Sequence, residues 1–222
     1  MKQVTRVPEL PFRDRRAAGW ALGQLLATSL TQGEAGDAIV LALPRGGVPV
    51  AWEVAQALGA PLDVLVVRKL GFPGHEEYAM GAIASGGVRV TNDGSDDWPV
   101  APAELEAVTA REQAELERRE RLYRGARPFP QLADRTVLLV DDGLATGATM
   151  RAAVRAVRLQ GAARIVVAVP VGARDSVEAL RAEADEVFSV STPEPFRAVG
   201  LWYRDFDQTS DDEVRRLLAP AG

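Results

Sequence analysis

The strongest constraint on the fold of this chain is a regular alternation between short apolar runs and segments with a helical spacing of apolar residues. The runs are rich in valine and leucine and are apolar along their whole length, which is typical of parallel strands that helices cover on both faces. The predicted strands are 38–43, 62–67, 136–140, 164–169 and 186–190, and the predicted helices are 47–58, 148–159 and 176–184. We therefore expect an α/β fold with a doubly wound, mostly parallel sheet flanked by helices.

Other segments lie outside this alternation. Asp14 is a suitable cap for a helix whose leucines recur at helical spacing. Residues 79–91 contain glycines and alternating residues, which predicts a small hairpin, and 103–124 is a predicted long helix with Glu–Arg pairs four residues apart. Residues 92–102, between them, are rich in turn formers. We expect a single domain over residues 1–222, with a core at about 14–192, an insertion at about 70–130 and a distinct C-terminal segment at about 193–222.

Composition excludes several classes of protein. The apolar fraction of 47% and the charged fraction of 26% are ordinary for a globular chain, and the longest apolar runs are far shorter than the ~20 residues of a membrane-spanning helix. The net charge of −5 argues against a nucleic-acid surface. Because the chain has no cysteine, its chemistry must use oxygen and nitrogen groups. We expect a cytoplasmic protein that binds neither nucleic acid nor a membrane.

The sequence VLLVDDGLATGATM, residues 137–150, is the strongest functional signal. An apolar strand ends in two carboxylates, Asp141 and Asp142, and a loop of small residues then leads into a helix. Small residues let the backbone approach a ligand closely, and amides at a helix start attract an anion. The residues of the predicted phosphate cradle are Gly143, Leu144, Ala145, Thr146, Gly147, Ala148 and Thr149. Two carboxylates would repel phosphate, so we expect them to address a sugar diol or a magnesium ion, and the pattern as a whole describes a site for a ribose 5-phosphate.

Two other phosphate-binding motifs do not fit the same segment. A P-loop needs a lysine followed by serine or threonine after its glycines, and a dinucleotide fingerprint needs three glycines at another spacing, so both are excluded. A phospho-aspartate enzyme and a purely structural strand–turn–helix stay open as minor alternatives.

The use of basic residues singles out a second segment. Of the 26 basic residues only Lys2 and Lys69 are lysines, and Lys69 lies six residues before His75, the only histidine. A compact ammonium differs from a guanidinium in geometry and hydration, so Lys69 is a candidate functional residue, with chance as the alternative. We assign His75 no catalytic role.

The segment 137–150 resembles the phosphoribosyl pyrophosphate (PRPP) signature of type I phosphoribosyltransferases. The resemblance implies that Asp141 and Asp142 hold the ribose hydroxyls, together with a magnesium ion that arrives with PRPP. It implies that the loop from Thr146 to Thr149 holds the 5-phosphate.

Two further segments are similar to the pyrophosphate-binding parts of that family. Residues 43–47, LPRGG, resemble the short loop that contacts pyrophosphate, which gives Arg45, Gly46 and Gly47 this role; a simple strand-to-helix turn is the alternative. Arg68 and Lys69 resemble the start of the mobile loop of orotate-type members, where a basic residue approaches the pyrophosphate. A Gly-Phe-Pro-Gly run replaces the second basic residue of such loops.

The C-terminal segment resembles the hood of purine-type members. Its sequence, PFRAVGLWYRDF at residues 195–206, implies that Trp202 and Tyr203, with Phe196 as a further candidate, contact the acceptor by stacking. Aromatic residues near a chain end can equally close a core.

The resemblance implies an enzyme, a phosphoribosyltransferase that moves the 5-phosphoribosyl group of PRPP to a nitrogen acceptor such as a nucleobase and releases pyrophosphate. Its expected cofactor is Mg²⁺, and a homodimer is expected because dimers are common in the family and among oligomers generally. Two alternatives stay open: a non-catalytic module that senses PRPP, and another phosphosugar enzyme such as a hydrolase or phosphorylase.

Overall fold

The computed structural model describes residues 9–31, 33, 36–73, 75–91 and 101–219. Within them, the centre of the molecule is a five-stranded sheet in the order β2-β1-β6-β7-β8. Its strands are β1 (Ala38–Ala42), β2 (Leu62–Val64), β6 (Thr136–Val140), β7 (Arg164–Val171) and β8 (Glu186–Ser191). Every neighbouring pair is parallel, so the predicted parallel sheet is confirmed.

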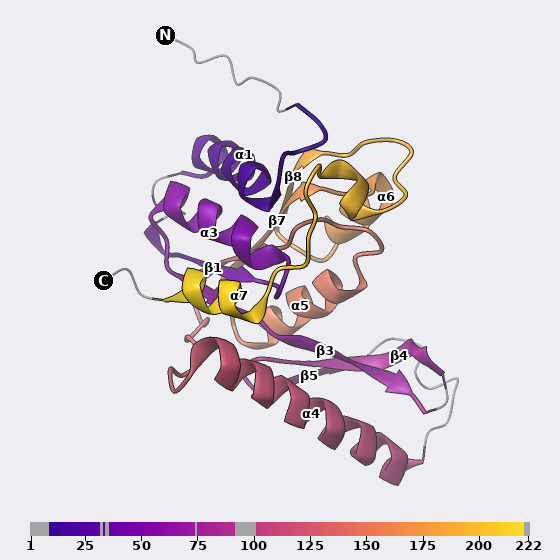
Figure 1. The fold of residues 1–222 in the computed structure, drawn as a ribbon. Coiled ribbons are helices and arrows are strands. Elements are labelled where there is room, and N and C mark those ends of the chain that lie inside the picture. Colours follow the sequence, from indigo (N-terminus) through magenta and orange to yellow (C-terminus); the bar gives the residue numbers. More distant parts are fainter. Residues whose placement is uncertain (1–8, 32, 34–35, 74, 92–100, 220–222) are drawn as a thin grey trace.

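Helices cover both faces of this sheet (Figure 1). The helices α1 (Arg15–Ser29) and α3 (Gly47–Leu58) pack on one face, and α5 (Ala148–Leu159) and α6 (Arg174–Leu180) pack on the other. Along β1, Val40 belongs to the apolar cluster of α1 and α3, whereas Leu41 belongs to the cluster of α5 and α6. Burial on both sides is the physical reason that these strands are unbroken apolar runs in the sequence.

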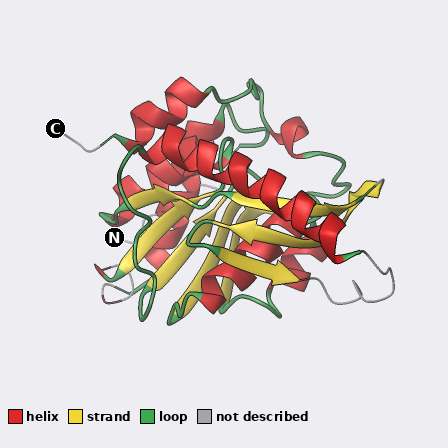
Figure 2. Ribbon diagram, turned by 90° about the horizontal axis from the view of Figure 1, so that it is seen from below, coloured by secondary structure: helices red, strands yellow, loops and turns green. Residues whose placement is uncertain are grey.

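A second sheet and a long helix form an arm beside this core (Figure 1). The strands β3 (Val67–Phe72), β4 (His75–Ala84) and β5 (Val88–Thr91) form an antiparallel three-stranded sheet. The helix α4 (Pro102–Arg124) lies across these strands, as Figure 2 shows. We call these four elements the arm. The predicted hairpin and long helix are confirmed, with a third strand added to the hairpin.

The structure differs from the sequence-based prediction where the arm begins. The predicted strand 62–67 ends at Val64, and the chain then crosses into β3, which lies in the other sheet. Arg68 and Lys69, predicted to begin a mobile loop, instead lie within β3 and are paired with β4. The apolar run that predicted a single strand therefore serves two sheets. Most of the predicted turn segment 92–102 lies outside the described residues.

The C-terminal segment closes back over the core. After β8, the short helix η2 (Val199–Trp202) is followed by α7 (Asp211–Leu218), which packs between α3 and α4 (Figure 1). The Phe12 amide donates to the Trp202 carbonyl at 2.8 Å, which ties this segment to the N-terminal one.

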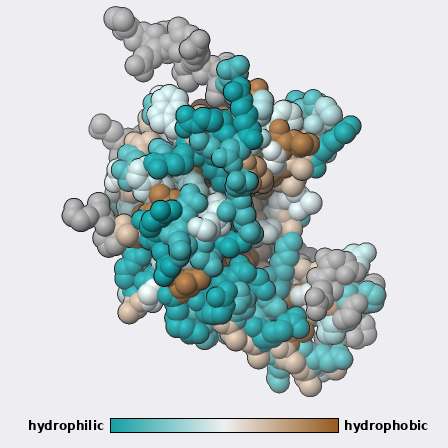
Figure 3. All heavy atoms as spheres, viewed as in Figure 1, coloured by the Kyte–Doolittle hydropathy of each residue, from teal (hydrophilic) through white to brown (hydrophobic). Residues whose placement is uncertain are grey.

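The face drawn in Figure 3 is mostly hydrophilic, with scattered hydrophobic residues. Among the described residues, no helix has both the length and the apolarity needed to cross a membrane.

Candidate functional site

The candidate site lies where two loops leave neighbouring strands of the parallel sheet. β1 and β6 are paired in parallel, with Ala42 opposite Val140 at their carboxyl ends. The Leu43 amide donates to the Val140 carbonyl at 2.9 Å, so the pairing continues into the loop that leads from β1 to α3. Ligands of such folds bind beyond the carboxyl ends of the strands, which is where both predicted loops emerge.

Gly46 and Gly47 allow the two loops to touch. A Cβ atom on Gly47 would lie 2.7 Å from the Val140 carbonyl oxygen, and one on Gly46 would lie 2.1 Å from Asp142 Oδ2. The Gly47 amide donates to the Leu43 carbonyl at 3.1 Å. Gly47 therefore acts through close packing, and among the described residues the amides of Arg45 and Gly46 are left as the donors of this loop.

The two carboxylates at the end of β6 are packed against this loop. Asp141 Oδ1 accepts a hydrogen bond from the Asp142 amide at 2.8 Å. Burial, together with the charge of Asp142, raises the pKa of Asp141 well above its ordinary value. Burial also raises the pKa of Asp142, against the opposing effect of the Arg15 guanidinium, whose Nε donates to Asp142 Oδ2 at 2.8 Å.

The loop after the carboxylates has one anchored residue and an open end. Leu144 is buried, its amide donates to the Val171 carbonyl at 2.9 Å, and its own carbonyl accepts from the Ala173 amide at 2.8 Å. The side chain of Ser176 donates to the Ala145 carbonyl. Leu144 is thus a structural support, whereas Ala145 and Thr146 are exposed.

The same loop ends at the N-terminus of α5. Gly147 has a φ of 73°, in the left-handed region that favours glycine, and no side chain caps the helix there. The first amides of a helix have no intrahelical acceptor and carry a partial positive charge. With Ala148 and the exposed Thr149 in the first turn, this end of α5 can accept a phosphate group.

Arg45 is linked to the C-terminal helix. Its guanidinium lies 3.6 Å from Asp211 Oδ1, and the same carboxylate oxygen accepts a hydrogen bond from the Tyr123 hydroxyl at 2.7 Å. Burial and the Asp211 carboxylate raise the pKa of Tyr123 to about 12, so the phenol stays protonated as a donor. The loop at residues 43–47 is therefore connected through Arg45 to both α7 and the arm.

The structure places Arg68 and Lys69 on opposite faces of the arm sheet. Arg68 donates to Glu112 of α4 from Nε at 2.9 Å and from a terminal nitrogen at 2.5 Å. Lys69 is exposed and lies opposite Ala82, which in turn lies opposite Val90, so the three residues share one face of the sheet. Val90 packs in the apolar cluster that contains the residues of α5. Lys69 therefore faces the side of the arm on which α5 lies, and Arg68 faces α4.

Two aromatic residues predicted to contact an acceptor are packed within the C-terminal segment. Tyr203 is 6% exposed, and its hydroxyl donates to the Asp142 carbonyl. Burial raises the pKa of Tyr203, so its hydroxyl stays protonated. The Trp202 ring stacks on Phe196 with centroids 6.3 Å apart, and within the described part of the chain Trp202 Nε1 is a buried donor without an acceptor. The burial of Tyr203 and its hydrogen bond to the Asp142 carbonyl indicate that it supports the loop of Asp142. Contact of Trp202 and Tyr203 with an acceptor stays a prediction.

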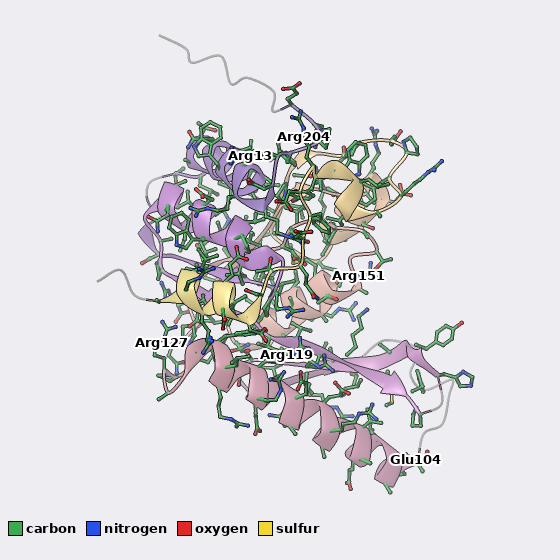
Figure 4. The ribbon with its side chains drawn as sticks, viewed as in Figure 1. Arg13, Glu104, Arg119, Arg127, Arg151 and Arg204 are labelled. Carbon is green, nitrogen blue, oxygen red and sulfur yellow. The ribbon has the colours of Figure 1, made fainter. Side chains whose placement is uncertain are left out.

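Sequence reasoning missed two arginines at the site. Arg15, the first residue of α1, contacts Asp142 although the two are 127 positions apart in the chain. Arg151 lies one turn into α5, where a terminal nitrogen of its guanidinium would be 3.9 Å from a Cβ atom on Gly147 and its Nε is 3.9 Å from Glu183 Oε1. Figure 4 shows Arg151 on α5 above the arm. In a chain with many arginines no local signal marks either one, although an arginine four residues after the last loop glycine could have been noted.

The carboxylates alone do not form a metal cage. Among the described residues, no three histidine, aspartate or glutamate side chains cluster so as to hold a metal ion. Magnesium binds oxygen ligands and usually keeps several waters while sharing one or two carboxylates with substrate phosphates. Asp141 and Asp142 fit a site of this kind, in which one or two carboxylates share the ion with a substrate.

Comparison with known proteins identifies the family of the chain. The family model described as "Phosphoribosyl transferase domain" matches residues 14–203. Two proteins named "Putative phosphoribosyl transferase", from two strains of Mycobacterium tuberculosis, are each 50% identical over 208 residues, covering 93% of this chain and 46% of the relative. The chain thus spans about half the length of these curated relatives.

A solved structure is also similar over nearly the whole chain. The crystal structure of the protein TT1426 from Thermus thermophilus is 45% identical, with a TM-score of 0.82, and the match covers 93% of this chain and 97% of that one. Since the family model covers most of the described core, including both site loops, the chain belongs to the phosphoribosyl transferase family. The resemblance inferred from the sequence is confirmed at this level.

Proposed function

We propose that this chain binds PRPP and transfers its 5-phosphoribosyl group to a nitrogen acceptor, with release of pyrophosphate. The acceptor class is a nucleobase or a related nitrogen heterocycle. The observation that carries the proposal is the junction of the two loops. Asp141 and Asp142 pack against Gly46 and Gly47. The loop that follows the two carboxylates leads into the N-terminus of α5, which no side chain caps. Two carboxylates, an uncapped helix N-terminus and the loop of Arg45 therefore lie near one another, which supports binding of a ribose, a phosphate and a pyrophosphate group.

The residues divide between the parts of PRPP. The end of α5, from Thr146 to Thr149, would bind the 5-phosphate, and the carboxylates would face the ribose. Arg45, the amide of Gly46 and the Lys69 ammonium would hold the pyrophosphate.

Such a site works by alignment and charge stabilisation. Displacement at the ribose C1 carbon passes through a transition state with oxocarbenium character, so the protein needs no covalent step. Holding acceptor, sugar and leaving group in line can contribute about 7–11 kcal/mol in favourable systems. Donors aimed at the leaving pyrophosphate stabilise the charge that develops there.

Magnesium is proposed to enter with PRPP. Oxygen atoms of Asp141 or Asp142 would share the ion with oxygens of the substrate, as the donor set allows. Bound in this way, magnesium supplies neutralisation of the pyrophosphate charge.

A calorimetric titration with PRPP, with and without Mg²⁺, tests the site. We expect magnesium-dependent binding that the double variant Asp141→Asn, Asp142→Asn loses while it still unfolds in a single cooperative thermal transition. Asp175→Asn, a change at an exposed acid in the first turn of α6, is the matched control and should bind as the wild type does. Unchanged affinity in the double variant would overturn the site assignment.

The reaction is tested next by screening nucleobases for pyrophosphate release. Release that depends on one class of acceptor supports the transferase. Tight PRPP binding without release for any acceptor favours a sensing module, and phosphate-dependent turnover without an acceptor favours another phosphosugar enzyme. The predicted homodimer stays a prediction, which light scattering can test.

A further inference from the structure

The two carboxylates of the site have unequal surroundings. Asp142 Oδ2 accepts from Arg15 Nε at 2.8 Å, and the side chains of these residues are only 15% and 12% exposed. The same oxygen lies so close to Gly46 that a Cβ atom there would be 2.1 Å away. Asp141 uses Oδ1 for the Asp142 amide, and its other oxygen has no partner in the described part of the chain.

Arg15 is itself held on its other sides. A terminal nitrogen donates to the Asp207 carbonyl at 2.6 Å, and the guanidinium carbon lies 3.9 Å from the centroid of the Phe206 ring. Both contacts come from the C-terminal segment, and Tyr203 of that segment also donates to the Asp142 carbonyl. For Arg15 to reach a ligand directly, it would have to give up the carboxylate, the carbonyl and the ring face together.

We propose that Arg15 is a positioning residue that gives the two acids, Asp141 and Asp142, different roles. It holds Asp142 as a supporting carboxylate against the Gly46 loop and leaves Asp141 as the acid that contacts the ligand. Two adjacent carboxylates repel each other, and a fixed guanidinium beside one of them lowers that repulsion while the other keeps an open oxygen. This inference rests on the proposed function, because the ligand is taken to be PRPP.

The proposal predicts a specific pattern of coupling between substitutions. Arg15→Gln and Asp142→Asn act on one interaction, so the double variant should bind PRPP about as well as Asp142→Asn alone. Asp141→Asn should weaken binding more than Asp142→Asn does, by about tenfold or more, because it removes the hydrogen-bond acceptor of the ligand itself. Its effect should add to that of Arg15→Gln, as expected for substitutions that act independently.

The test is a set of calorimetric PRPP titrations in the presence of Mg²⁺, with affinities compared as double-mutant cycles. Arg15→Lys restores a positive charge beside Asp142 and should recover part of the PRPP affinity lost in Arg15→Gln. If Arg15 only stabilised the fold, two variants of equal thermal stability would bind PRPP equally well. Arg13→Gln is the matched control. Arg13 lies two positions earlier, pairs with Asp14 on the surface and sits beside Arg204 (Figure 4), so PRPP binding should not change.

The outcomes separate this inference from the proposed function. Absence of PRPP binding by the wild type would overturn the function and the inference with it. Wild-type binding, with Arg15→Gln and Asp142→Asn losses that simply add, would overturn the inference alone. Equal losses for Asp141→Asn and Asp142→Asn would do the same, and this comparison holds even if Arg15→Gln fails to fold.

Discussion

At the scale of single residues, Gly46 and Gly47 set the distance between the two site loops. Neither position has a positive φ, so their requirement for glycine comes from space and not from backbone conformation. At Gly47 the obstacle is backbone, because a Cβ atom would lie 2.7 Å from the Val140 oxygen and 2.9 Å from the Asp141 Cα atom. Backbone of a buried strand end cannot move aside as a flexible side chain can.

Gly47→Ala is therefore expected to lower the free energy of unfolding by about 1–3 kcal/mol, as overpacking usually does, and to weaken PRPP binding. Urea denaturation monitored by circular dichroism measures the first effect. Gly36→Ala is the control, because nothing lies within 4 Å of a Cβ atom there. Equal stability of the two variants would show that the loops can separate without cost.

Asp141 is predicted to lower the free energy of unfolding at neutral pH although it serves ligand binding. Its pKa is raised in the folded state, so the fold binds the proton more tightly than the unfolded chain, whose carboxyl titrates near an ordinary value of about 3.9. The contribution of this group to stability is present below that value and is lost as the pH rises through the raised pKa. Asp141→Asn should thus be more stable than wild type at pH 7, with little difference near pH 3, although it loses PRPP affinity.

Thermal unfolding of both proteins across this pH range checks the prediction. Asp185→Asn is a useful contrast, because hydrogen bonds from the Ile165 amide and Arg158 lower the pKa of Asp185, so its removal should destabilise the fold at pH 7. A parallel pH dependence of wild type and Asp141→Asn would contradict the assigned burial of the charge.

Much of the candidate site was predictable at this scale, and Arg15 shows why the rest was not. The letters RDRR at residues 13–16 give no reason to separate three arginines. The structure pairs Arg13 with the adjacent Asp14, Arg15 with Asp142 and Arg16 with Glu53. Only the partner far along the chain makes Arg15 part of the site, and that partner is set by tertiary packing. Asp141 and Asp142 were predictable because their strand, their loop and the helix after it are contiguous.

At the scale of elements, the same distinction explains the error at β3. The bounds of α3, β6 and α5 follow from local pattern, and the predicted and observed ranges agree. The run 62–67 has a pattern that suits one buried strand, yet its end belongs to β3, whose partner β4 lies in the arm. Which sheet a short apolar run joins depends on strands elsewhere in the chain, so periodicity alone could not divide it.

Placement within β3 predicts different outcomes for its two basic residues. Lys69→Ala should lower the turnover of the proposed transferase with little change in stability, because Lys69 is exposed on the face toward α5. Arg68→Ala should lower the free energy of unfolding, because it leaves Glu112, which is 8% exposed, without its two hydrogen bonds from Arg68. A loss of about 1.5–3 kcal/mol is expected for such charged hydrogen bonds.

Single-turnover rates and urea denaturation on the same two variants separate these roles. If Lys69→Ala weakened PRPP binding as much as it lowered the rate, Lys69 would not act mainly at the transition state. If Arg68→Ala were as stable as wild type, the contact with α4 would not support the arm.

At the scale of the whole molecule, the arm is joined to the parallel sheet through a buried ion pair. Arg124, at the end of α4, has a side chain only 3% exposed, and its Nε lies 3.1 Å from Asp63 Oδ1 in β2. A terminal nitrogen of Arg124 also donates to the Val64 carbonyl at 2.8 Å. The pair therefore holds α4 against the strand that precedes β3, at the point where the chain leaves one sheet for the other. An arm that carries Lys69 is useful to a site on the core only if this junction is rigid.

Asp63→Ala should test this junction. Loss of one partner of a buried ion pair typically costs about 3–5 kcal/mol. Arg124 keeps Glu120, whose Oε1 lies 3.2 Å from a terminal nitrogen, so we expect a loss near or below the lower end of this range. The exposed pair of Glu117 and Arg121 should contribute less than about 1 kcal/mol. Glu117→Ala is therefore the control on the same helix. In the Asp63→Ala protein we expect hydrogen exchange to accelerate in β3, β4 and β5 before it does in β1 and β6, because the arm loses its attachment while the central sheet keeps its pairing. Uniform acceleration across both sheets would show that the arm and the core unfold as one unit, and a loss of stability no larger than that of Glu117→Ala would show that the junction is held by apolar packing instead.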